Sequence, residues 1–164
     1  MARTLTKMKG RREHESFIAL PHGVIQSENW RAMSPYAVKL FIDLYSQYRG
    51  SNNGDFTAAW SVMKPKGWRS KGTLHKALKE LEWFGMIDLT RRGGLNRCNL
   101  YAVTFKPIDE CKGKLDVSAT RLPSRRWSVV VAPFSNAKKT RSPALPMGHA
   151  GSSGSPAVAV SSPV

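Results

Sequence analysis

The sequence predicts an α+β fold in which three helices precede a β-hairpin, all within residues 17–106. Two observations support this fold class. Apolar residues recur with helical spacing over residues 35–48 and again over residues 70–84, and two short apolar runs follow Gly85 with a pair of glycines between them. Four of the five tryptophans also lie in residues 17–106, so most of the material for a hydrophobic core is there.

The first part of this region predicts one long helix. Residues 17–20 form a short apolar run that indicates a small strand, and residues 24–30 indicate one or two helical turns. Ser34 and Pro35 then begin the long helix, because serine caps a helix N-terminus and proline fits its first position. Glycines and asparagines in residues 50–54 end it in a loop. Its apolar positions have the spacing of a helix buried on one face: Ala37, Leu40, Phe41, Leu44, Tyr45 and Tyr48.

Two shorter helical segments follow. Thr57 is expected to cap a second helix that ends before Pro65, because proline disfavours helical geometry in the residue before it. Residues 66–68 form a turn. Ser70 then caps a third helix, which Gly85 closes.

The hairpin completes the predicted domain. Residues 86–90 and 99–105 are expected to be its strands, with residues 91–97 as the loop and Gly93-Gly94 at the tip. The alternation leaves open which face of the second strand is buried. Helix, helix, turn, helix and hairpin, in this order, make up a winged helix-turn-helix, in which the hairpin is the wing.

The net charge of +15 favours a polyanionic partner, because neutralising phosphates releases condensed counterions. The charge alone leaves nucleic acid, ribosomal RNA and an anionic membrane surface open. It is concentrated at the ends: residues 1–12 hold five basic side chains and no acidic one, and residues 111–164 hold eight basic and one acidic. Residues 13–110 are closer to balance, with 13 basic and ten acidic.

Composition divides the chain into three parts. We expect residues 1–16 to be a flexible basic arm, residues 17–106 to be the winged helix-turn-helix domain and residues 107–164 to be a flexible basic tail rich in Pro, Ser and Gly. Residues 127–134 are an apolar interruption of the tail, either a docking segment or a stray strand. Removal of residues 111–164 is expected to leave the domain folded.

The third helix has two different faces. Leu74, Leu78 and Leu81 fall on one side, whereas His75 and the nearby lysines fall on the other. Residues 64–79 contain six basic side chains and no acidic one, which suits a phosphate at the helix N-terminus.

Residues 52–105 resemble the winged helix-turn-helix DNA-binding proteins of bacterial phages, plasmids and integrated elements. The resemblance extends over about residues 17–106, and Pro65 departs from its pattern. It implies that the third helix enters the major groove while the wing touches backbone or minor groove. It is carried by Asn53-Gly54, Ser70, Ala77-Leu78-Lys79-Glu80-Leu81, Gly85-Met86-Ile87 and Arg92-Gly93-Gly94-Leu95-Asn96-Arg97.

These features predict which residues contact double-stranded DNA. We expect Ser70, Lys71, Thr73 and His75 to lie closest to the bases or the nearest phosphates, and Lys76 and Lys79 to contact phosphate. Arg69 and three wing arginines complete the set: Arg91, Arg92 and Arg97.

The leading hypothesis is a transcriptional regulator of a mobile element, which binds DNA in the cytoplasm. A plasmid or phage replication initiator would use the same domain. Two further alternatives are a winged-helix protein-interaction module with non-specific nucleic-acid binding, and a non-specific RNA-binding protein. A homodimer is possible, although no long heptad segment supports one.

Other classes of function lack support in the sequence. No phosphate-binding loop or nucleophile-elbow pattern occurs, so we do not expect an enzyme or a cofactor. Four histidines are too dispersed for a metal site, and two cysteines fit a reduced compartment. No apolar run approaches the length of a transmembrane helix and no secretory signal is recognisable, so no membrane partner is expected.

Overall fold

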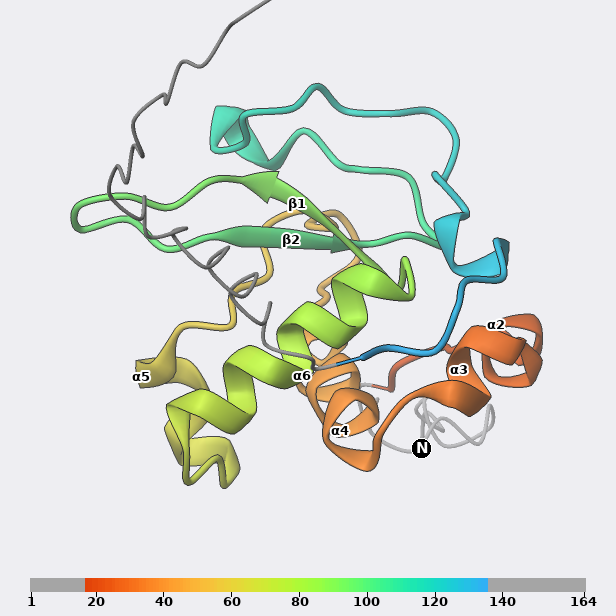
Figure 1. Ribbon diagram of the computed structural model, residues 1–164. Coiled ribbons are helices and arrows are strands. Elements are labelled where there is room, and N and C mark those ends of the chain that lie inside the picture. The colour runs from red at the N-terminus through yellow and green to blue at the C-terminus, as the bar shows by residue number, and fades with distance from the viewer. Residues whose placement is uncertain (1–16, 136–164) are drawn as a thin grey trace, which may run out of the picture.

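The computed structural model describes residues 17–135, and they form the mixed α+β fold that the sequence predicts (Figure 1). The α-helices lie on one side of a two-stranded antiparallel sheet. In chain order the elements are α2 (His22–Gln26), α3 (Glu28–Ala32), α4 (Pro35–Tyr45), α5 (Trp60–Met63), α6 (Lys71–Trp83), β1 (Ile87–Arg91) and β2 (Leu100–Val103). Three 3₁₀ turns accompany them: η1 (Lys64–Lys66), η2 (Cys111–Gly113) and η3 (Arg126–Ser128).

Helices α4 and α6 begin where the sequence predicts. The Ser34 hydroxyl accepts the backbone N–H of Ala37 at 3.3 Å, and the Ser70 hydroxyl accepts that of Thr73 at 3.3 Å. The two helices pack against each other and bury their predicted apolar faces. A buried carboxylate fixes their relative position, because Glu80 of α6 accepts both the N–H and the hydroxyl of Ser34 at the start of α4.

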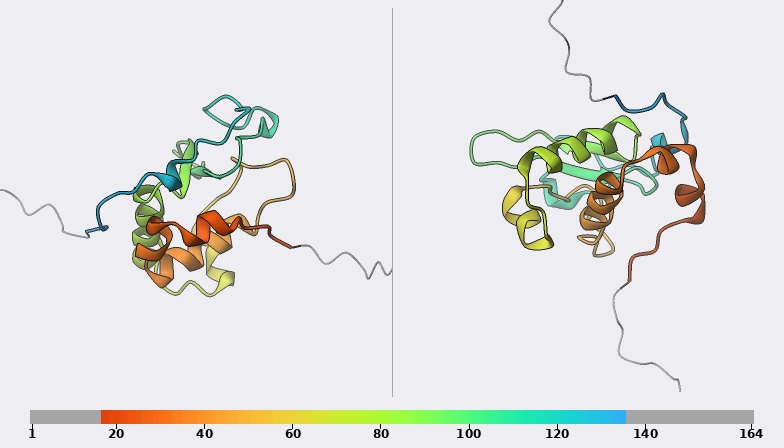
Figure 2. Two further views of the ribbon diagram at one scale, coloured as in Figure 1. Left: turned by 90° about the vertical axis from the view of Figure 1, so that its right-hand side faces the viewer. Right: turned by 60° about the horizontal axis from the view of Figure 1, so that its bottom comes forward.

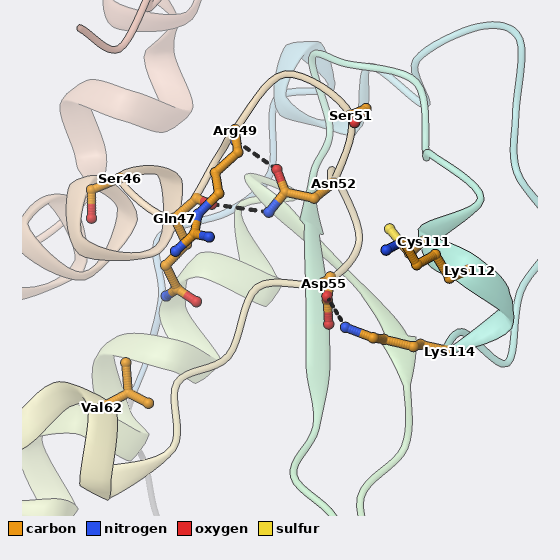
Figure 3. A pocket seen from close by; sticks show the side chains of 10 residues that line it. All are labelled: Ser46, Gln47, Arg49, Ser51, Asn52, Asp55, Val62, Cys111, Lys112 and Lys114. Atoms are coloured by element: carbon orange, nitrogen blue, oxygen red, sulfur yellow. Dashed lines mark hydrogen bonds and ion pairs between the residues drawn. The ribbon is translucent and has the colours of Figure 1, made fainter. Parts of the chain in front are cut away.

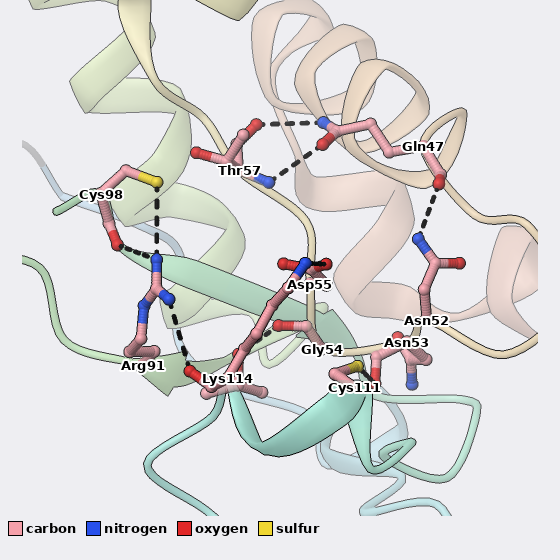
Figure 4. A network of polar contacts seen from close by, with 11 residues as sticks. Gln47, Asn52, Asn53, Gly54, Asp55, Thr57, Arg91, Cys98, Cys111 and Lys114 are labelled. Atoms are coloured by element: carbon pink, nitrogen blue, oxygen red, sulfur yellow. Dashed lines mark hydrogen bonds and ion pairs between the residues drawn. The ribbon is translucent and has the colours of Figure 1, made fainter.

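Helix α5 is shorter than predicted. It begins at Trp60, and Thr57 does not cap it, because the Thr57 hydroxyl accepts the N–H of Ala59, which precedes the helix, at 3.2 Å. The backbone of Thr57 exchanges two hydrogen bonds with the Gln47 amide (Figure 4). Pro65 does not end the helical path outright: it lies inside η1, directly after α5. Gly67 then reverses the chain with a φ of 88°, a left-handed conformation that glycine adopts without steric cost.

The hairpin forms as predicted but its tip is displaced. Ile87 pairs with Val103 and Leu89 with Tyr101, with an irregularity before Arg91. Gly94 and Arg97 exchange two backbone hydrogen bonds at 3.1 Å, which places Leu95 and Asn96 at the tip in place of Gly93-Gly94.

One strand prediction is wrong and one pairing was missed. Residues 17–20 form no strand. Phe56 instead exchanges two backbone hydrogen bonds with Tyr101, at 2.8 and 3.2 Å, and so adds a single antiparallel bridge to the sheet. Because one isolated aromatic residue carries no alternation, the sequence pattern could not reveal this bridge.

The predicted domain boundary at residue 106 is also wrong. Residues 107–135 pack on the domain, mostly along the face of the hairpin away from α6 (Figures 1 and 2). Asp116 donates its N–H to the Thr90 carbonyl and Arg125 donates to the Thr104 carbonyl, at 2.9 and 2.8 Å. Strand β2 is therefore buried on both faces. Tyr101 and Val103 face the core, and Leu100 and Ala102 are buried on the opposite side.

Two buried asparagines hold this segment in place. The Asn53 side chain donates to the carbonyls of Val103, Lys106 and Pro107 and accepts the N–H of Val103 at 2.8 Å. The Asn29 side chain donates to the carbonyls of Phe84, Trp127 and Val129, and accepts the N–H of Val131. Residues 127–134 therefore dock within the chain itself, without forming a strand.

These contacts predict a difference between two truncations. Removal of residues 107–164 would expose one face of β2 and take away the partners of Asn29 and Asn53 in that segment, which include the carbonyls of Trp127, Val129 and Pro107, so we expect the remaining chain to unfold at 25 °C. Removal of residues 136–164 keeps every one of these contacts and should leave the urea midpoint nearly unchanged. Equal midpoints for all three chains would contradict the packing of residues 107–135.

The remaining expectations about the termini concern residues 1–16 and 136–164, which lie outside the described residues. Between Phe17 and Ser135, none of the helices combines the length and the apolar character needed to cross a bilayer.

Candidate nucleic-acid interface

The exposed face of α6 carries the predicted basic residues. Lys71, His75, Lys76 and Lys79 are exposed, whereas the leucines of α6 are buried against the core. From Arg69 to Lys79 every exposed residue is basic, histidine, serine or glycine. The next carboxylate along the chain, on Glu80, is buried and bonded to Ser34. The outward face is therefore positive along its N-terminal turns.

The predicted basic side chains on this face differ in whether they already contact other residues of the chain. Within residues 17–135, the side chains of Arg69 and Lys76 have no hydrogen-bond or ion-pair partner. The ammonium of Lys71 lies 5.9 Å from the centre of the Trp60 ring, and that of Lys79 lies 3.0 Å from a Glu82 oxygen. Such exposed pairs contribute little energy, so both lysines can exchange them for phosphate.

Two of the predicted site residues also have structural tasks. Thr73 is half-buried, and its backbone N–H bonds to the Ser70 hydroxyl. Ser70 is thereby an N-cap first, and any contact it makes to DNA uses the remaining capacity of its oxygen.

The two lysines before Gly67, Lys64 and Lys66, differ in their contacts. The Lys66 ammonium donates to the Ser46 hydroxyl at 2.7 Å and to the Asp43 carbonyl at 3.2 Å, so it is bonded to the end of α4. Lys64 is exposed. By sequence position, both lysines group with the basic residues of α6. In the structure, the turn at Gly67 separates Lys66 from the exposed face of α6.

The three hairpin arginines are not equivalent. Arg92 and Arg97 are exposed, and their side chains have no partner in the described part of the chain. Arg91 is half-buried and donates to the carbonyls of Cys98 and Lys114, at 3.2 and 3.4 Å (Figure 4). Arg91 thus joins the base of the loop to the segment that follows the hairpin, which makes it a structural residue.

A hollow of about 460 Å³ lies between α6 and the hairpin. Lys79 and Glu82 line it from α6, and Arg92 and Asn99 line it from the hairpin loop and its return. One cation of the helix, Lys79, and one of the loop, Arg92, therefore line the same hollow. Arg126 also lines this hollow, where it pairs with Asp88. Sequence reasoning missed Arg126, because it lies in the segment that we expected to be a flexible tail.

The C-terminal end of α6 is partly covered. The Trp83 indole donates to the Ala132 carbonyl at 2.8 Å, and its ring centre lies 6.2 Å from that of Phe134. The segment after η3 thus contacts α6 beside Trp83, and within residues 17–135 the exposed side chains from Lys71 to Lys79 lie outside this contact.

A larger open pocket, of about 670 Å³, lies away from this face (Figure 3). It is lined by the loop after α4 and by η2, and none of its lining residues belongs to α6 or to the hairpin loop. Lys114 and Asp55 form an ion pair of 2.6 Å in it. Burial and the nearby carboxylates raise the pKa of the Cys111 thiol, which stays protonated at neutral pH. That thiol is therefore not poised as a nucleophile.

Burial also raises the pKa of the Tyr101 hydroxyl, and the hydrogen bond from Asn99 opposes that shift only in part. Tyr101 stays neutral and adds no negative charge to the hairpin. Residues 17–135 hold no group of three or more His, Cys, Asp and Glu side chains that could bind a metal ion. No family model matches the chain, and no curated protein or solved structure matches it either.

Proposed function

We propose that this chain is a winged helix-turn-helix protein that binds double-stranded DNA, with α6 in the major groove and residues 91–97 as a wing on the adjacent backbone. The observation that carries the proposal is the outward face of α6, where only basic, histidine, serine and glycine residues are exposed between Arg69 and Lys79. The next two carboxylates along α6 are both engaged, because Glu80 is buried and bonded to Ser34 and Glu82 pairs with Lys79.

The shape of the face supports a duplex as its partner. Helix α6 has 13 residues, and an α-helix is about 10–12 Å across with its side chains, which fits a B-form major groove about 12 Å wide. The major groove of an RNA duplex is too narrow to admit it. Arg92 lines the same hollow as Lys79 of α6, so one bound duplex could contact helix and wing together.

The order of elements also supports the winged-helix assignment. Helices α4, α5 and α6 precede β1 and β2, and the hairpin loop extends beyond the helices (Figure 2, right). Within this class we propose a transcriptional regulator of a mobile element, which is the leading hypothesis from the sequence; the resemblance itself does not separate a regulator from a plasmid or phage replication initiator.

Substitution of two base-proximal residues tests the reading role of α6. Lys71→Ala together with His75→Ala is expected to lower discrimination between a selected duplex and a scrambled one by about 1–3 kcal/mol, because base-edge contacts are lost. Affinity for both duplexes would be measured by fluorescence anisotropy at one salt concentration. If both affinities fall equally, these residues contact phosphate alone and the assignment of base readout to them is wrong.

A further inference from the structure

Leu95 is the most exposed large apolar side chain among the described residues, with 92% of its surface accessible. It lies at the tip of the hairpin loop, between Gly94 and Asn96. A single exposed leucine is ordinary on a protein surface. Leu95 differs because of the hydrogen-bonded turn that carries it and because of what surrounds it.

The tip is held by a closed set of hydrogen bonds. Gly94 and Arg97 bond to each other in both directions, and Asn96 takes the left-handed φ of 59° that closes the turn. Below them, the Gly93 N–H donates to the Asn99 side chain. A Cβ atom on Gly93 would lie 2.7 Å from the Arg97 carbonyl, so this position requires glycine. Leu95 is thus presented at the end of an ordered turn.

The surroundings of Leu95 favour DNA over a protein as the partner. Two glycines and an asparagine are its near neighbours, and they form no apolar patch on which a protein could dock. Arg92 and Arg97 flank it and are exposed, so both sides of the tip attract phosphate. The leucine can donate and accept no hydrogen bond, and the minor groove presents no thymine methyl group for it to contact. Its specific mode of contact in that groove is insertion between stacked bases.

We propose that Leu95 is a wedge that enters the minor groove next to the segment bound by α6 and bends the duplex there. The inference rests on the proposed function. Apolar side chains inserted from the minor groove partly unstack one base step and kink the duplex by about 20–90°. Flexible pyrimidine–purine steps cost least to unstack, so such a step is expected beneath the wing.

The experiment measures binding and bending in the same sample. The full-length chain is titrated against a duplex of about 20 base pairs, well below the persistence length of about 150 base pairs, which carries the sequence enriched by that chain and a fluorophore at each end. Anisotropy reports binding, and energy transfer between the ends reports bending. The variants are Leu95→Ala and Leu95→Met. The matched control is Leu122→Ala, which removes another exposed leucine, 78% accessible, from the segment after the hairpin.

The wedge predicts that energy transfer rises when the wild type, Leu95→Met and Leu122→Ala bind, and that it does not rise with Leu95→Ala. Affinity of Leu95→Ala should fall by no more than about tenfold, because the lost apolar contact is offset by the unstacking energy that is no longer spent. A straight duplex under bound wild type, or equal bending by Leu95→Ala, overturns the wedge while DNA binding stands. If wild type binds no duplex, the proposed function fails and the wedge fails with it.

Discussion

Replacing Asn53 by alanine is expected to lower the free energy of unfolding by about 3–5 kcal/mol, the largest effect on stability that we predict. The Asn53 side chain is completely buried and bonds to backbone groups of residues 103, 106 and 107. Alanine would leave three carbonyls and one N–H buried with no bond from this side chain. Each unsatisfied group costs about 1–3 kcal/mol, and partial entry of water offsets some of the total.

Urea unfolding followed by tryptophan fluorescence measures this effect. Asn53→Asp is the isosteric test, because it keeps the shape and removes the donating NH₂, so it should cost nearly as much. Gln26→Ala is the matched control, since Gln26 is an exposed amide on α2 and its loss should change stability by less than about 0.5 kcal/mol. Asn53→Ala with stability equal to the control would refute the role of Asn53 as the clamp of residues 103–107.

Replacing Lys76 and Arg97 together by alanine is expected to weaken DNA binding about 30-fold at 0.15 M salt. Both side chains are exposed without an ion pair in the described part of the chain, one on α6 and one on the hairpin loop. Each phosphate contact contributes about 0.9 to the slope of log affinity against log salt, so the slope should decrease by about 1.8. Affinities measured from 0.05 to 0.3 M salt give this slope directly.

The control variant removes the same charge from elsewhere. Arg31 on α3 and Arg121 in the segment after the hairpin are exposed and lie outside both α6 and the hairpin loop, so Arg31→Ala with Arg121→Ala should leave the slope nearly unchanged. Equal losses in the two double variants would show that binding depends on net charge alone, with no preferred face.

The sequence was sufficient for the parts of the fold that local chemistry determines. Ser34 and Ser70 cap α4 and α6 because each serine precedes a run with helical spacing, and both the cap and the spacing are local signals. The hairpin followed from two alternating runs around glycines. Its tip was misplaced because Gly93 is required by a close approach to Arg97 and Asn99, which is a tertiary constraint.

The sequence was insufficient where long-range contacts decide. Asn53 was interpreted as a residue of a resemblance motif, and nothing local showed that its side chain would bond to residues fifty positions later. The same holds for Asn29, whose partners lie about a hundred residues away. Residues 107–135 were predicted to be flexible because of their polar composition. They are part of the fold because the side chains of Asn29 and Asn53 bond to them.

The candidate site divides in the same way. Helical periodicity placed Lys71, His75 and Lys76 on the exposed face of α6, where the structure has them. Periodicity cannot show which cations are already engaged, so it did not separate the half-buried Arg91 from its exposed neighbour Arg92.

The central claim is that the exposed face of α6 reads duplex DNA, and one competition measurement tests it most directly. Duplexes enriched by the full-length chain from a random library would compete at 0.15 M salt against scrambled duplexes of the same composition. We predict a preference of about 10³-fold or more for the enriched sequence. A ratio near one, with binding that disappears as salt rises, would show only non-specific attraction to phosphate and would contradict the account.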